Sequence, residues 1–172
     1  GSDWRKVIVL NAVTKEKIGE TLVDVKFSGV SWYKNEGFYY SSYDKPTGSE
    51  LSAKTDQHKL YYHKLKKKKK EDKVVFGNDL KRRYVGGSVT EDNLYLVISA
   101  ANATSSNDLY LVDLTQPKFE IKALVDNMTF DYDIVDNRGS KLYVITNNNA
   151  PNKKLMIIDA NNPELPNWLE VI

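Results

Sequence analysis

The chain has 172 residues, of which 41% are hydrophobic, and it contains no cysteine. This length and composition predict one soluble globular domain with a substantial core, and they exclude disulfides and thiolate metal sites. No apolar run approaches the roughly 18 residues that a membrane-spanning helix needs, and the first residues lack the pattern of a signal peptide. We therefore expect no membrane partner.

The formal charge of +2 depends on one local run of lysines. Without Lys64 and the five consecutive lysines 66–70, the charge would be −4. A run of like charges this dense repels itself and is typical of a solvated turn. A nucleic-acid surface would instead spread Lys and Arg over one face among stacking aromatic residues, so no nucleic-acid partner is expected.

A strand-like apolar segment recurs four times along the chain. Measured from Val7 through Leu60 and Leu109 to Leu155, the copies are separated by 53, 49 and 46 residues. Each of the last three copies follows two strand-like segments joined by a polar turn, and these turns lie at residues 34–37, 90–93 and 136–139. Asn, Asp and Gly at these positions favour tight hairpins, and a period near 40 to 50 residues indicates a propeller or an array of repeats.

A further short strand-like segment follows each copy, so the repeating unit is a four-stranded antiparallel sheet. The pattern predicts an all-β fold, a partial β-propeller of about three and a half blades in a single domain spanning residues 1–172. The expected parts are a half blade at 1–27 and blades at about 28–77, 83–126 and 128–172. A β-sandwich is the structural alternative, but it does not explain why the same four-segment order is repeated.

We find no residue pattern that indicates a catalytic or metal centre. The Gly-x-Ser-x-Gly elbow of α/β-hydrolases is absent from the sequence. His58 and His63 are five residues apart on an expected strand, where they should point to opposite faces and be partly exposed. Asp131, Asp133 and Asp136 match no EF-hand spacing, and we assign them to turn formation rather than to a calcium site. No cofactor and no metal are expected.

Several ordered motifs carry a family resemblance. These are Gly1-Ser2-Asp3-Trp4, Val25 to Trp32, Gly48-Ser49-Glu50, Lys59-Leu60-Tyr61-Tyr62-His63, Gly86-Gly87, Thr146-Asn147 and Pro151-Asn152. As an ordered set they resemble the N-terminal β-propeller of the prolyl oligopeptidase (prolyl endopeptidase) family. The likeness runs over essentially the whole chain.

The resemblance implies a seven-bladed propeller over a separate α/β-hydrolase domain, whose Ser, Asp and His cleave short peptides after proline. The propeller would gate substrate access, and this chain would be a non-catalytic fragment of a serine peptidase found in the cytoplasm or periplasm. Its partners would be the missing hydrolase domain, the remaining blades and short proline-containing peptides. The alternative is a stand-alone propeller scaffold for protein interactions. An open array of blades is also expected either to self-associate or to be marginally stable.

The resemblance also implies three residues of the substrate-cavity wall, which are Phe27, Val85 and Thr104. Phe27 corresponds to an aromatic residue on the substrate side. Val85 stands where the family often has Met, so the wall stays hydrophobic but loses a bulkier contact. Thr104 ends the loop Ala101 to Thr104, where a Cys and an Arg can occur in the family and neither is present here.

Overall fold

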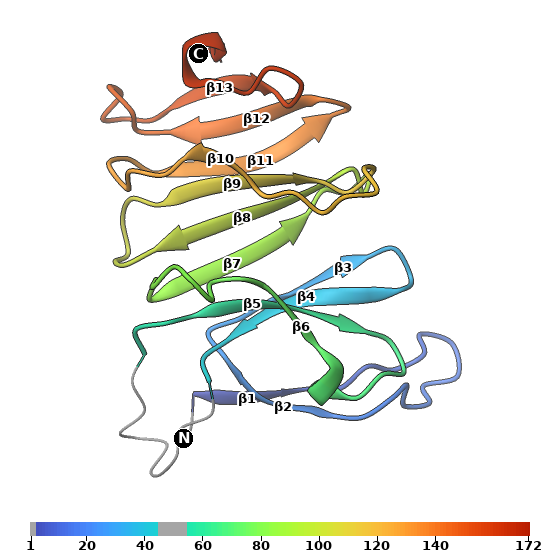
Figure 1. Ribbon diagram of the computed structural model, residues 1–172. Helices are drawn as coiled ribbons and strands as arrows, with labels where there is room; N and C mark the ends of the chain where they lie inside the picture. Colours follow the sequence, from blue (N-terminus) through green and yellow to red (C-terminus); the bar gives the residue numbers. More distant parts are fainter. Residues whose placement is uncertain (1–2, 45–54) are drawn as a thin grey trace. The chain divides into compact units, whose positions relative to one another are not determined.

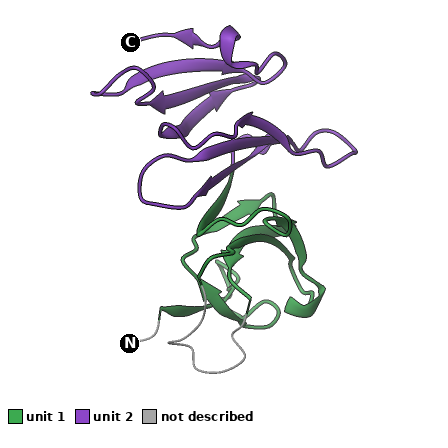
Figure 2. Cartoon of the chain, turned by 60° about the vertical axis from the view of Figure 1, so that its left-hand side comes forward, with its two compact units in different colours: residues 1–88 green, residues 89–172 purple. Residues whose placement is uncertain are grey.

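The computed structural model describes residues 3–44 and 55–172, which form β-strands joined by turns and short 3-10 helices (Figure 1). The motif Gly48-Ser49-Glu50 lies outside the described residues. Residues 1–88 and 89–172 form two compact units, which Figure 2 colours separately. Each unit is described by itself below.

The first unit contains two antiparallel sheets. A two-stranded sheet pairs β1 (Trp4–Val7) with β2 (Leu22–Lys26). The second sheet has the order β3-β4-β5-β6, so each strand pairs with its neighbour in the chain. Its strands are β3 (Val30–Tyr33), β4 (Gly37–Ser42), β5 (Lys59–Lys64) and β6 (Lys73–Phe76), with the 3-10 helix η2 (Lys69–Glu71) between the last two.

The strand β7 (Tyr84–Val89) crosses the boundary between the units, and its sheet has the order β10-β9-β8-β7. The last sheet has the order β11-β12-β13-β14. The strands of the second unit are β8 (Tyr95–Ala101), β9 (Asp108–Asp113), β10 (Lys122–Val125), β11 (Tyr132–Arg138), β12 (Lys141–Thr146), β13 (Lys154–Asp159) and β14 (Leu169–Glu170), with the 3-10 helix η3 (Leu165–Asn167) before β14.

The predicted fold class is confirmed, because the described residues build four-stranded antiparallel sheets in which consecutive strands are neighbours. The chain also reverses at the first two expected turns, although β4 already begins at Gly37, the last residue of the turn expected at 34–37. The third expected turn, at 136–139, is wrong in its bounds. The strand β11 continues to Arg138 because a register shift between Ile134 and Asp136 absorbs an extra residue, and the chain reverses at Gly139, whose φ is 55°.

Each unit has its own apolar core, formed mostly by inward side chains of its strands. The buried cluster of the first unit consists of Val9, Leu22, Val25, Phe38 and Tyr40. In the second unit the cluster is larger, and it includes Leu109, Leu142, Val144, Ile158 and Trp168. Within the described ranges, no helix is long and apolar enough to cross a membrane.

Gly86 and Gly87 of β7 offer a matched test of packing in the first unit. A Cβ atom on Gly87 would lie 2.7 Å from both Cδ atoms of the fully buried Leu60, whereas a Cβ on Gly86 meets nothing within 4 Å. We expect Gly87→Ala to lower the free energy of unfolding by about 1–3 kcal/mol through overpacking. Gly86→Ala should change it by less than about 0.5 kcal/mol. Urea unfolding of the two variants checks this, and equal midpoints would contradict the packing.

Candidate functional site

The first unit contains a cavity of about 270 Å³ beside the strands β3, β4 and β7. Two stretches of the chain supply most of its lining: residues 27–31, which lead into and begin β3, and residues 85–88 of β7. Tyr40 and Ser41 of β4 complete the lining. The wall therefore combines aromatic and aliphatic surface with serine hydroxyls and three glycines, a mixture typical of a site for an organic ligand rather than for an ion.

Phe27 stands at the entrance to β3 in an unusual backbone conformation. Its φ is 51°, in the left-handed region that a bulky side chain rarely adopts, and its side chain is 47% exposed. The ring packs at 6.2 Å, centroid to centroid, against Tyr43 and against Tyr84, while Lys26 Nζ lies 5.2 Å from its centre. Such strain costs about 1–3 kcal/mol and persists only where neighbouring groups impose it.

His58 bonds to Lys26, which directly precedes the first stretch of the wall, and to Val85 in the second. The Val85 N–H donates to His58 Nδ1 at 2.9 Å, so Nδ1 is the unprotonated ring nitrogen. Consequently Nε2 carries the hydrogen and donates it to the Lys26 carbonyl, also at 2.9 Å. The side chain is 1% exposed, and the Tyr43 ring packs against it at 4.5 Å. Burial lowers the pKa of His58 below its ordinary value of 6.5, which keeps the ring neutral.

The structure brings two of the three expected wall residues together. Phe27 and Val85 line the same cavity, and Val85 is 3% exposed. Thr104 lies in the second unit, on an exposed loop after β8, and is not part of this lining. The expectation that the two histidines are partly exposed is wrong, because His58 is 1% and His63 is 2% exposed. His58 has hydrogen-bond partners for both ring nitrogens and His63 for Nδ1, and such partners allow a polar ring to be buried.

A second buried polar network surrounds His63 on β5. His63 Nδ1 donates to Asp72 Oδ1 at 2.7 Å, and the Tyr40 hydroxyl donates to Asp72 Oδ2 at 2.8 Å. The side chains of His63 and Asp72 are each 3% exposed. Burial raises the pKa of Asp72, although the hydrogen bonds from His63 and Tyr40 oppose this shift. Burial also raises the pKa of Tyr40 far above its ordinary value of 10.0.

Tyr40 belongs to two cavities of the first unit. The second cavity has a volume of about 200 Å³, and Asp72 and Lys69 also line it. Tyr61 stacks on Tyr40 with ring centres 5.3 Å apart, and burial raises its pKa to about 12. Tyr40 thus connects the cavity wall at Ser41 with the buried carboxylate at Asp72.

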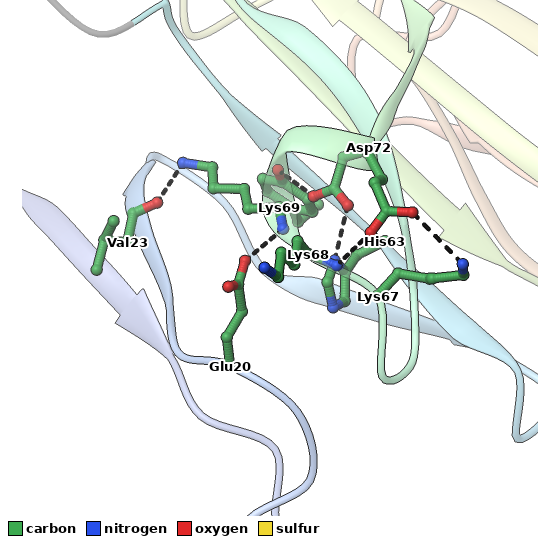
Figure 3. A network of polar contacts seen from close by, with 9 residues as sticks. Glu20, Val23, His63, Lys67, Lys68, Lys69 and Asp72 are labelled. Atoms are coloured by element: carbon green, nitrogen blue, oxygen red, sulfur yellow. Dashed lines mark hydrogen bonds and ion pairs between the residues drawn. The ribbon is translucent and has the colours of Figure 1, made fainter.

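The lysine run next to this network differs in part from the solvated turn that its charge predicts. Lys66, Lys67, Lys68 and Lys70 are exposed, as expected, but Lys69 is half-buried. Figure 3 shows its backbone N–H directed at the Glu20 carboxylate and its ammonium group at the Val23 carbonyl. Lys69 therefore ties η2 to the segment around β2.

The three aspartates considered for calcium do not converge. Asp131 Oδ1 accepts a hydrogen bond from the Ser106 N–H at 2.5 Å, which is a loop-bracing contact. Asp133 and Asp136 are exposed on β11. In the part of the chain that the structure describes, no group of three or more His, Cys, Asp or Glu residues is arranged to hold a metal ion.

Comparison with known proteins agrees with the sheet architecture. Residues 1–172 match the family described as prolyl oligopeptidase, N-terminal beta-propeller domain. The chain belongs to this family. The incomplete set of four-stranded sheets is therefore part of a β-propeller, as the repeats predicted.

Relatives with curated names and solved structures are similar over nearly the whole chain. A prolyl endopeptidase of Elizabethkingia meningoseptica is 48% identical over 174 aligned residues, which cover 100% of this chain and 24% of that protein. A solved prolyl endopeptidase structure has a TM-score of 0.83 at 28% identity, covering 92% of this chain and 23% of its own. Prolyl oligopeptidase B from Galerina marginata, bound to a 25mer macrocyclization substrate, gives 0.83 at 26% identity, covering 100% and 26%. This chain thus spans about a quarter of the relatives' length.

His58 should make the stability of the chain sensitive to mild acid. Because the pKa of His58 is lower in the folded state than in the unfolded state, the unfolded state binds more protons in mild acid. We expect the free energy of unfolding to fall as the pH drops below about 6.5, the ordinary pKa of histidine. Urea unfolding at pH 7.5 and 5.5 measures this. His58→Gln, which lacks the titrating ring, should show a smaller decrease, and equal decreases would refute the assignment.

The hydrogen bond from Tyr40 to Asp72 should contribute more to stability than the weak one that Tyr61 makes. The Tyr61 hydroxyl lies 3.4 Å from the exposed carboxylate of Asp44, whereas Tyr40 reaches a buried acceptor. Tyr40→Phe should therefore cost about 1.5–3 kcal/mol, as expected for a bond to a charged group. Tyr61→Phe, the matched control, should cost less than about 0.5 kcal/mol. Chemical denaturation compares them, and similar losses would argue against the network.

Proposed function

We propose that this chain is the non-catalytic propeller part of a serine peptidase that cleaves short peptides after proline. The carrying observation is that the whole chain belongs to the N-terminal propeller family, while it spans only about a quarter of curated prolyl endopeptidases. The nucleophilic Ser and its His and Asp partners then belong to a hydrolase domain outside this chain. The propeller controls which substrates reach that domain.

The two histidines support a non-catalytic role for the chain. His63 and Asp72 form the kind of pair that orients a general base, but both side chains are 3% exposed, so a substrate has no access to the ring. The third member of the network is the Tyr40 hydroxyl, which donates to the carboxylate rather than to the histidine. His58 uses both ring nitrogens to hold backbone groups. Both histidines thus have structural roles.

The cavity supports a role in substrate contact. Phe27 and Val85 supply an aromatic and an aliphatic surface, which suit a proline ring and its neighbouring side chains. Gly86, where an added Cβ would meet nothing, leaves open space beside Val85. We propose Phe27 and Val85 as wall residues, and the exposed Thr104 as a third contact from the loop after β8.

Apolar side chains near the C-terminus support the remaining blades as partners. Leu169 of β14 is 63% exposed, and Ile172 is 83% exposed. Repeat units bury their apolar surface against adjacent units, so these side chains fit the face of a following blade. The same surface would drive self-association of the chain when it is isolated.

Substrate gating is tested with one cleavage sequence in two settings. The full-length protein should cleave a short proline-containing peptide, and it should leave the same sequence uncut when it forms a loop of a folded carrier protein. A peptidase with an open active site is the control, because it should cut both. The isolated 172-residue chain should cut neither. Equal kcat/KM for peptide and carrier would overturn the gating role, and turnover by the purified chain would overturn the non-catalytic role.

A further inference from the structure

We propose that His58 is the positioning residue that holds Phe27 and Val85 in the cavity wall. The proposal rests on the proposed function, since it gives these two residues a role in substrate contact. His58 is not among the residues that line the cavity. It acts through the backbone groups on either side of it, the carbonyl of Lys26 and the amide of Val85.

The geometry joins two segments that are far apart in the sequence. Lys26 is 32 residues before His58 and directly precedes Phe27, while Val85 follows 27 residues after it. One rigid ring therefore sets the separation of the two stretches that form most of the wall. The φ of Phe27, 51°, is defined by the carbonyl carbon of Lys26 and three atoms of Phe27. Holding the Lys26 carbonyl therefore also constrains the orientation of Phe27.

The backbone of His58 is itself fixed, so the ring has little freedom to follow a moving wall. Its N–H donates to the Arg82 carbonyl at 2.7 Å. Its carbonyl lies against Gly77, where an added Cβ would come within 2.6 Å of that oxygen. The Tyr43 ring covers one side of the imidazole, and the Tyr43 hydroxyl donates to the Arg83 carbonyl. His58 is thus anchored to the chain that leads into β7.

A corresponding bridge in the second unit shows which part of this arrangement is general. Asn107 directly precedes β9 as His58 directly precedes β5, and its Oδ1 accepts the Tyr132 N–H of β11 at 2.8 Å. Its backbone N–H donates to the Phe130 carbonyl at 3.1 Å, as that of His58 does to Arg82. In both cases, the residue just before the third strand of one sheet accepts a hydrogen bond from an N–H in the first strand of the following sheet.

His58 adds one contact to this shared bridge. The Asn107 amide donates to the carbonyls of Tyr132 and of Asp108, its own neighbour. The longer imidazole of His58 instead extends to Lys26, beside Phe27. Histidine combines an acceptor and a donor on one planar ring, whereas Lys and Arg lack an acceptor. The extra reach couples the wall residue Phe27 to the bridge.

Two variants separate the two hydrogen bonds. The amide oxygen of His58→Asn lies near the position of Nδ1, so this variant should keep the Val85 bond and lose the Lys26 bond. The amide nitrogen of His58→Gln lies near the position of Nε2, so this variant should keep the Lys26 bond and lose the Val85 bond. His58→Leu should lose both. His63→Asn is the matched control, because His63 is equally buried but touches neither stretch of the wall.

The experiment measures kcat and KM of the full-length protein with a short chromogenic proline-containing peptide. We expect His58→Leu to raise KM by about tenfold, the effect of about 1.4 kcal/mol, with kcat changed by less than about twofold. His58→Asn should raise KM in the same direction while amide hydrogen exchange at residues 82–87 stays protected. His58→Gln should lose that protection. His63→Asn should leave KM unchanged.

A Phe27→Ala variant distinguishes failure of the positioning role of His58 from failure of the proposed substrate contact at the wall. If Phe27→Ala raises KM but His58→Asn and His58→Leu do not, His58 is not a positioning residue. If Phe27→Ala leaves KM unchanged, the wall function is wrong, and exchange at residues 82–87 then decides whether His58 still holds Val85. Unchanged exchange in both His58→Gln and His58→Leu overturns the inference. The conservative Asn and Gln variants keep the test decisive even if His58→Leu does not fold.

Discussion

Polar groups inside these small sheets must find hydrogen-bond partners, because an unpaired buried donor or acceptor costs about 1–3 kcal/mol. His58, His63 and Asn107 meet this requirement in each case with a partner from another segment. Their bonds do what apolar packing alone does poorly, since directional contacts fix the register between segments. The cavity wall and the packing around β5 therefore depend on a few buried polar side chains as well as on the apolar clusters.

The cavity itself results from the way that separate repeats meet. Its lining comes from the entrance to β3, from β4 and from β7, which lie in different parts of the repeating pattern. None of these segments contains the whole site.

Strand positions could be predicted from the sequence because they depend on local alternation and on turn residues. The recurring segments around Leu60, Leu109 and Leu155 all lie in strands, β5, β9 and β13. The burial of His58 could not be predicted, because its partners are 32 and 27 residues away and only the packed sheets bring them together. The turn near Asp136 was misplaced for a related reason, since a register shift inside β11 leaves no clear mark in the residue pattern. Lys69 likewise differs from its neighbours only through its contacts with β2 and the residues before it.

The two corresponding bridges differ in one chemical respect. Burial lowers the pKa of His58 in the folded state, so the imidazole binds a proton in mild acid mainly when its bridge opens, whereas the carboxamide of Asn107 does not titrate in that range. Once His58 is protonated, Nδ1 becomes a donor and faces the Val85 N–H, so the bridge to β7 is replaced by a repulsive contact. Acid should therefore loosen the bridge from His58 to β7 in the first unit before it affects the bridge from Asn107 to β11 in the second. In a repeat protein whose sheets look alike, one ring nitrogen is enough to give neighbouring repeats different thresholds for local unfolding.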